Sequence, residues 1–168
     1  GTTTSASAVQ ITINFAAVND APTLTTIATL TGGEQFAIYP VTYATLLAAA
    51  NAADVDGDAL SFEFTSLTAG TLQQTDNATN ITTSDRLATD QTWNYTPAGS
   101  ATGNLAAFTL KAYDGTVTSA TAVQVTINFA LDTALPSVPT GVSVPTYSKI
   151  DVVVSFTPGT DANLDPAN

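Results

Sequence analysis

The sequence predicts an all-β protein, an antiparallel β-sandwich of about seven strands with one short helix. Residues 9–15, and again residues 123–129, alternate apolar with polar side chains, which is the period of a strand with one buried face. Further short segments of this kind are separated by Gly, Asp, Asn and Pro, as is typical of antiparallel sandwiches. The hydrophobic content of 44% over 168 residues is sufficient for a core.

The other strands are expected in seven segments, and one stretch between them breaks the strand pattern. The segments are residues 23–30, 35–41, 59–66, 70–74, 91–95, 105–113 and 149–157. Thr42 is followed by a run rich in Ala and Leu, the best helix formers available. With Thr42 as the N-cap, residues 43–50 are predicted to form a short helix whose Leu46, Leu47 and Ala50 pack on the sheet.

The chain contains an internal repeat. Residues 1–15 recur as residues 115–129, and twelve of the fifteen positions are identical at an offset of 114 residues. A repeat of this length is a whole sandwich domain, not a solenoid turn. We therefore expect residues 1–15 to be the last strand of a preceding copy and residues 16–133 to be one complete domain with its linkers. Residues 134–168, with a different and Pro-rich pattern, begin another, incomplete module.

The composition excludes several function classes. Fourteen Asp and Glu oppose three Lys and Arg, so little is available to neutralise the phosphates of a nucleic acid or an anionic membrane. Without Cys, Met or His, thiol nucleophiles, imidazole bases and soft-ligand metal sites are excluded. No apolar run approaches the roughly 18 residues of a membrane span. What remains is oxygen chemistry, with cations as the expected partners.

The segment "NAADVDGDAL" carries the clearest chemical signal, because it places Asp54, Asp56 and Asp58 within five residues. Like charges this close repel one another unless a cation offsets them, and a hard divalent ion is the natural occupant, calcium before magnesium. The segment is not an EF-hand, since the positions that would need Gly and Glu are Ala59 and Thr65. A solvated Asp- and Gly-rich turn is the alternative from this local string alone.

A wider pattern resembles a known family. The order "VNDAPTLT", "ADVDGDALSFEFTS" and "FTLKAYDGTVTSATAVQVTINF" is similar to the cadherin and bacterial cadherin-like repeat over residues 16–129. That repeat runs from a linker Asn-Asp-x-Pro, through an Asp-x-Asp loop, to an Ala-x-Asp-Gly before the final hairpin. The resemblance implies an Ig-like Greek-key sandwich in a tandem array.

The resemblance also implies a calcium site that joins two neighbouring domains. Carried over position by position, the linker supplies Asn19, through its backbone carbonyl, and Asp20. The loop supplies Asp54 and Asp56, and Asp114 reaches in from "AYDG". In the family these ligands meet at the pole of the domain that faces its upstream neighbour.

Several residues extend the family pattern or depart from it. Asp58 is an additional acid and a further candidate ligand, while Glu34 in "GGEQF" resembles a first-strand glutamate that serves the opposite pole. The Leu-Asp-Arg-Glu set of animal cadherins has no clear counterpart, which implies fewer ions per junction. Downstream, Thr133 and Ala134 replace the Asn and Asp of the upstream linker, so we expect no full calcium site there.

The C-terminal piece resembles a second family over a short stretch. "PSVPTGVSV", followed by the alternating Ile150, Val152, Val154 and Phe156, is similar to the first two strands of a fibronectin type III module. Modules of this kind fit an extracellular modular protein better than an enzyme.

The remaining signals favour a structural interpretation. Trp93 and Tyr95 would suit a sugar-stacking platform, but alternating aromatic residues in a strand are more often core. Glu34 and Glu63 are the two Glu of the chain, and Glu63 is expected to point to solvent, which disfavours a glycosidase pair. Lys111 is out of phase with its apolar neighbours, which argues against the buried lysine that an isopeptide cross-link needs.

The sequence therefore predicts a non-enzymatic, calcium-rigidified rod or spacer from a large extracellular bacterial surface protein. Its expected partners are neighbouring repeats of the same polypeptide, with self-assembly into a fibre or surface layer, and neither nucleic acid nor membrane insertion is expected. Two alternatives remain. One is a carbohydrate- or partner-binding accessory module of a secreted enzyme or adhesin, and the other is a filament subunit assembled by strand donation.

Overall fold

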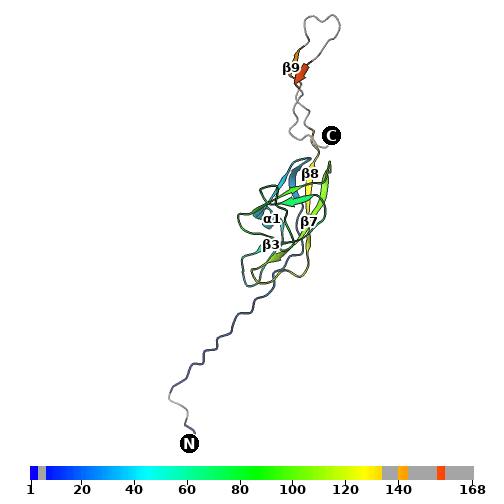
Figure 1. The fold of residues 1–168 in the computed structure, drawn as a ribbon. Coiled ribbons are helices and arrows are strands. Elements are labelled where there is room, and N and C mark those ends of the chain that lie inside the picture. Colours follow the sequence, from blue (N-terminus) through cyan, green and yellow to red (C-terminus); the bar gives the residue numbers. More distant parts are fainter. Residues whose placement is uncertain (4–6, 134–139, 144–154, 158–168) are drawn as a thin grey trace, which may run out of the picture.

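Two β-sheets and one short helix make up the main body of the chain (Figure 1). The computed structural model describes residues 1–3, 7–133, 140–143 and 155–157. The five-stranded sheet has the order β1–β8–β7–β3–β5, and the three-stranded sheet has the order β2–β6–β4. The predicted all-β sandwich is confirmed.

The strands of the larger sheet are β1 (Leu30–Glu34), β8 (Val123–Ala130), β7 (Gly103–Tyr113), β3 (Ser61–Leu67) and β5 (Arg86–Leu87). Those of the smaller sheet are β2 (Tyr39–Thr42), β6 (Thr92–Thr96) and β4 (Thr71–Gln73). Strand β8 lies inside the larger sheet, antiparallel to β7 and parallel to β1. The β1–β8 pair is the departure from the predicted antiparallel arrangement within the described residues.

The core lies between the two sheets and is rich in aromatic rings. Trp93 and Tyr95, from β6, lie at centroid distances of 6.4 Å and 6.2 Å from Phe108 on β7. Both side chains are buried, which confirms their interpretation as core residues and removes the exposed platform that sugar stacking would need. Burial of large apolar side chains contributes about 1.5–3 kcal/mol each, so this cluster holds the sheets together.

The predicted helix is present as α1 (Tyr43–Ala49). The hydroxyl of Thr42 accepts the backbone N–H of Thr45 at 3.0 Å, as expected for an N-cap. Leu46 is fully buried and Ala50 is partly buried against the core. Leu47 was expected to pack on the sheet, and that prediction is wrong, since the side chain is 38% exposed. Leu46 and Ala50 share one face of the helix, whereas Leu47 lies about 100° further round.

The predicted strand boundaries were wrong at the first two segments. Residues 23–29 form only isolated bridges at Thr23 and Ile27, because the side chain of Asn51 accepts the N–H groups of Thr25 and Thr26, and the strand begins only at Leu30. In the segment 35–41, Phe36 has a φ of 63° in a turn, so β2 starts only at Tyr39.

No strand was predicted at β5, or at the residues of β1 after Leu30. Strand β1 contains Gly32 and Gly33, and a Cβ on Gly33 would lie 2.8 Å from the carbonyl oxygen of Asn128. Glycine therefore allows β1 to approach β8 closely. In the sequence, however, the same two glycines interrupt the strand pattern. Strand β5 has only two residues, which is too short for an alternation to show.

Outside the sandwich, residues 9–15 carry no strand and lead away from it as an extended trace (Figure 1). At the other end, β9 (Thr140–Ser143) and β10 (Ser155–Thr157) pair antiparallel. Ile150, Val152 and Val154 of the expected fibronectin type III strands lie outside the described residues. In the described part of the chain, no helix is both long enough and apolar enough to cross a membrane.

Candidate metal centre

Three aspartates lie together on the loop that runs from α1 to β3. One carboxylate oxygen from each of Asp54, Asp56 and Asp58 lies within 4.8 Å of the other two. The Oδ1 atom of Asp54 accepts the backbone N–H of Asp56 at 2.9 Å and that of Asp58 at 3.2 Å, which curls the loop around it. Gly57 has a φ of +79°, which glycine adopts without steric cost. The three carboxylates are therefore gathered by the loop's own backbone.

The incoming linker, residues 16–20, is bonded to this loop and to the β7–β8 turn. The backbone N–H of Asp20 donates to Oδ2 of Asp56 at 2.7 Å. The side-chain amide of Asn19 donates to Oδ2 of Asp114 at 3.0 Å. Two adjacent linker residues thus contact two of the acids that the sequence singled out. The predicted ligands Asn19, Asp20, Asp56 and Asp114 lie at the same pole of the sandwich.

Asp114 is held by its own turn. Its Oδ1 atom accepts the backbone N–H groups of Thr116 at 2.6 Å and Val117 at 2.7 Å, and its side chain is buried. The hydrogen bond from Asn19 lowers the pKa of the Asp114 carboxyl, and the two backbone bonds lower it further against the effect of burial. Asp114 is therefore an ionised group that faces the linker.

The residues present fit a calcium ion. Calcium takes oxygen ligands at about 2.3–2.6 Å, so two oxygens bound to the same ion lie no more than about 5 Å apart. The 4.8 Å limit of the Asp54, Asp56 and Asp58 oxygens satisfies that condition. In addition, Oδ2 of Asp54 is buried without a hydrogen-bond partner. A buried, unpaired carboxylate oxygen is costly unless a cation offsets its charge.

No basic side chain of the described residues is bonded to this cluster. Arg86 instead donates two hydrogen bonds to Glu63, with a shortest distance of 2.7 Å, and lies over the ring of Tyr113. The cluster therefore carries uncompensated negative charge, which favours a cation.

Glu34 lies at the other end of the sandwich. It ends β1, where it pairs with Ala130 at the end of β8. The end of β8 lies beside the start of β7, where Phe129 pairs with Gly103. Asp114 follows Tyr113 at the other end of β7, so the length of this strand separates Glu34 from Asp114. The structure therefore does not bring Glu34 to the cluster, in agreement with its expected position at the opposite pole.

Two amide side chains that the sequence did not single out make long-range hydrogen bonds to the backbone of other segments. Asn51 bonds Thr25 and Thr26 and so holds the segment after the incoming linker. Gln35 is buried, donates to the carbonyl oxygen of Ser100 at 2.6 Å and accepts the N–H of Asp132 at 3.2 Å. A Gln or Asn between apolar segments gives no local sign of these long-range partners.

A family model described as a bacterial Ig domain matches residues 19–128, which extend from the incoming linker into β8. The chain belongs to the bacterial Ig domain family. Neither the search of curated proteins nor the search of solved structures found a match. The match ends before residue 134, so the fibronectin type III start stays a prediction.

Membership of this family supports a general role. Bacterial Ig domains commonly occur as structural repeats of surface proteins and are typically not enzymes. In this bacterial Ig domain the two glutamates lie at opposite ends of the larger sheet, since Glu63 pairs with Lys111 and Glu34 pairs with Ala130. They do not form the carboxylate pair of a glycosidase, whose members lie within about 10 Å of each other.

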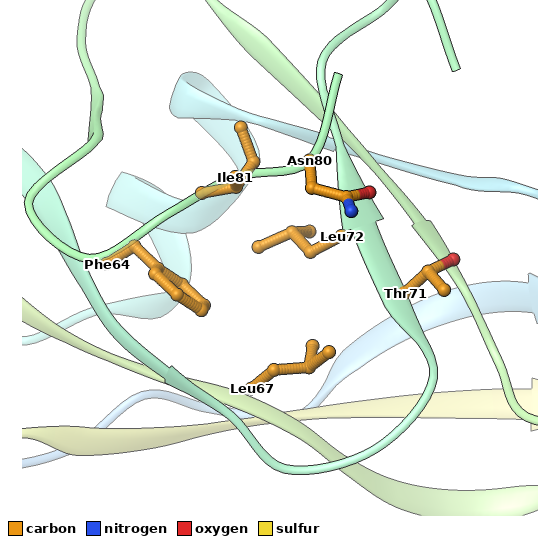
Figure 2. Close-up of a pocket in the computed structure, with 6 residues that line it drawn as sticks. All are labelled: Phe64, Leu67, Thr71, Leu72, Asn80 and Ile81. Atoms are coloured by element: carbon orange, nitrogen blue, oxygen red, sulfur yellow. The ribbon is translucent and has the colours of Figure 1, made fainter. Parts of the chain in front are cut away.

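Two hollows of this bacterial Ig domain lie away from the acidic loop. Figure 2 shows the smaller one, of about 150 Å³, lined mainly by Phe64, Leu67, Leu72 and Ile81. The larger one is an open groove of about 670 Å³ between α1 and residues 89–92. The smaller hollow has no acidic or basic side chain in its lining, and the groove has only Asp90. None of the predicted ligands lines either hollow.

Proposed function

We propose that this bacterial Ig domain is a spacer repeat of an extracellular surface protein, and that a calcium ion stiffens its junction with the preceding repeat. The ion would be held by Asp54, Asp56 and Asp114, with Asn19 and Asp20 from the linker and Asp58 as a further oxygen donor. One observation carries the proposal. Both linker residues already bond acids of the sandwich, Asn19 to Asp114 and Asp20 to Asp56.

The bound ion would supply electrostatic cross-linking. The linker of residues 16–20 would otherwise rotate about two soft dihedral angles per residue. A cation shared by linker and loop oxygens would remove much of that freedom and neutralise the carboxylates around the buried Oδ2 atom of Asp54. A rod of such repeats would keep its length and direction. The chain has no Cys, so no disulfide performs this task.

Calcium should raise the melting temperature of the chain. Calcium-binding extracellular modules have a Kd of about 10⁻⁴–10⁻³ M, so about 10 mM calcium is at least ten times that Kd. Binding at ten times the Kd stabilises the folded state by about 1.4 kcal/mol. For a domain of this size, Tm should rise by about 5 °C. The measurement is thermal unfolding of the full chain in calcium, in magnesium and in chelator.

Asp56→Asn should abolish most of this rise, because the substitution removes one charge from the cluster. Asp90→Asn is the matched control, since Asp90 is exposed and has a φ of 64° that Asn also tolerates. The control should keep the full response to calcium. An equal Tm in calcium and chelator for the parent chain would refute the calcium site.

A further inference from the structure

The exposed segment of residues 9–15 carries the same core-facing side chains as β8. At the offset of 114 residues, Ile11, Ile13 and Phe15 correspond to Val125, Ile127 and Phe129. In β8 these three side chains are at most 1% exposed, and they belong to the core. In residues 9–15 the matching side chains, together with Val9, are 69–86% exposed. One strand sequence is thus present twice, once buried and once uncovered.

The environment of β8 shows what such a strand needs. Ile127 pairs with Leu30 on β1 and with Leu105 on β7. Phe129 pairs with Gly33 on β1, where a Cβ would lie 2.8 Å from the Phe129 ring. The strand therefore has a hydrogen-bonded neighbour on each side and a glycine against its last aromatic ring. Addition at the edge of a sheet would supply only one of these neighbours.

The sandwich of this chain cannot supply that position to its own residues 9–15. Asn19 bonds Asp114, beyond the last residue of β7, while Phe129 pairs with the first residue of β7, Gly103. A strand of 11 residues spans about 33–36 Å. Phe15 is four residues from Asn19, a reach of about 14 Å at most. Phe15 therefore cannot reach the place of Phe129 in the same sandwich.

A complete second copy would also gain nothing by exchange. Its own β8 already occupies the position between β1 and β7, so each strand taken in would release another. Each chain has two copies of this strand sequence, but its described residues offer only one place between β1 and β7. However the copies are exchanged between chains, one strand per chain therefore stays uncovered. The acceptor must therefore be a sandwich that has no other last strand.

We propose that residues 9–15 are the last strand of a second sandwich of the same construction, inserted between its equivalents of β1 and β7. That sandwich is the repeat that immediately precedes the incoming linker. This inference rests on the proposed role as one of a series of repeats, but it does not depend on calcium. It places the end of the preceding sandwich, at Phe15, within about 14 Å of Asn19, so the acidic loop faces another domain.

The test adds the missing sandwich to the full chain. A copy of residues 16–114 is placed directly before Gly1, so that residues 1–15 follow it as residues 115–129 follow in the parent. Hydrogen exchange is then measured for the amides of residues 9–15 in the extended chain and in the parent chain. Protection should rise by roughly 100-fold or more in the extended chain, because these amides enter the middle of a sheet.

Two matched variants of the extended chain distinguish insertion of the strand into the added sandwich from mere closeness to it. Ile13→Asp places a charge on the core-facing side, and it should remove the protection and unfold the added sandwich while the original one stays folded. Thr12→Asp changes the adjacent residue on the other face, whose counterpart Thr126 is only half-buried, and it should keep the protection. Equal protection in the extended and parent chains, or equal effects of the two variants, would overturn the inference.

A chelator arm distinguishes this inference from the calcium proposal. Protection of residues 9–15 that persists in chelator supports strand insertion whatever the outcome for calcium. Calcium-dependent melting of the parent chain without any protection in the extended chain would refute strand insertion and leave the calcium site standing.

Discussion

Individual aspartates in this domain have two different tasks. Asp76 and Asp114 each accept two backbone N–H groups of the turn that they begin, through Oδ1, and their Oδ2 atoms accept side-chain donors, the Thr79 hydroxyl and the Asn19 amide. Asp54 also anchors its loop through Oδ1, but its Oδ2 atom is buried and has no hydrogen-bond partner. The sequence predicted that Asp54 and Asp56 belong to a site, because their spacing is short. It could not show which oxygen is free, since that depends on how the loop curls.

Asp76 should make stability depend on pH in a defined window. Bonds from the hydroxyl and backbone of Thr79, and from the N–H of Ala78, lower the pKa of the Asp76 carboxyl from 3.8 to about 2. A lowered pKa stabilises the fold above pH 3.8, and this contribution is lost as the pH falls through about 2. Asp76→Asn should therefore be less stable than the parent at pH 7.

Urea unfolding at several pH values tests this prediction. The difference in unfolding free energy between the parent and Asp76→Asn should shrink between pH 4 and pH 2. A difference that stays constant down to pH 2 would contradict the assigned role of Asp76.

At the scale of elements, the predictions succeeded where the period was clear. The strands β3, β4, β6, β7 and β8 each overlap a predicted segment, because their alternating side chains face either the core or solvent. Residues 31–34 of β1 were missed because the fit of this strand depends on glycine beside β8, a partner more than ninety residues away. Helix α1 was predicted from its composition and cap. Its buried face was predicted only in part, because a helix of seven residues is too short for a clear periodic pattern.

The cap of α1 should contribute measurably to stability. Thr42→Ala removes the hydroxyl that accepts the N–H of Thr45, and it should lower the unfolding free energy by about 1 kcal/mol. Thr42→Ser keeps the acceptor oxygen and should cost much less. Chemical denaturation of the three proteins measures both effects, and equal losses for Ala and Ser would show that the hydroxyl does not act as a cap.

The close approach of β1 to β8 should make Gly33 sensitive to the smallest side chain. Gly33→Ala introduces a Cβ that would lie 2.8 Å from both the Asn128 carbonyl oxygen and the Phe129 ring. Accommodating such an overlap typically costs about 1–3 kcal/mol. Thr31→Ala, on the same strand but exposed, should stay within about 0.5 kcal/mol of the parent. No destabilisation by Gly33→Ala in urea unfolding would contradict the described register.

At the scale of the whole molecule, the two poles of the sandwich differ. The upstream pole carries the acidic loop, Asp114 and the bonded linker, whereas the downstream pole fixes Asp132 through the neutral side chain of Gln35. The candidate site could be predicted only in part from local spacing. Asn19 and Asp114 are 95 residues apart, so the resemblance to cadherin-like repeats was needed to place them together.

A calorimetric titration of the full chain with calcium tests the central claim most directly. We expect saturable binding with a Kd of about 10⁻⁴–10⁻³ M, weaker binding of magnesium, and at least a tenfold loss of calcium affinity in Asp56→Asn but not in Asp90→Asn. Absence of saturable calcium binding up to about 10 mM, or equal affinity in the parent and in Asp56→Asn, would contradict a calcium-stiffened junction.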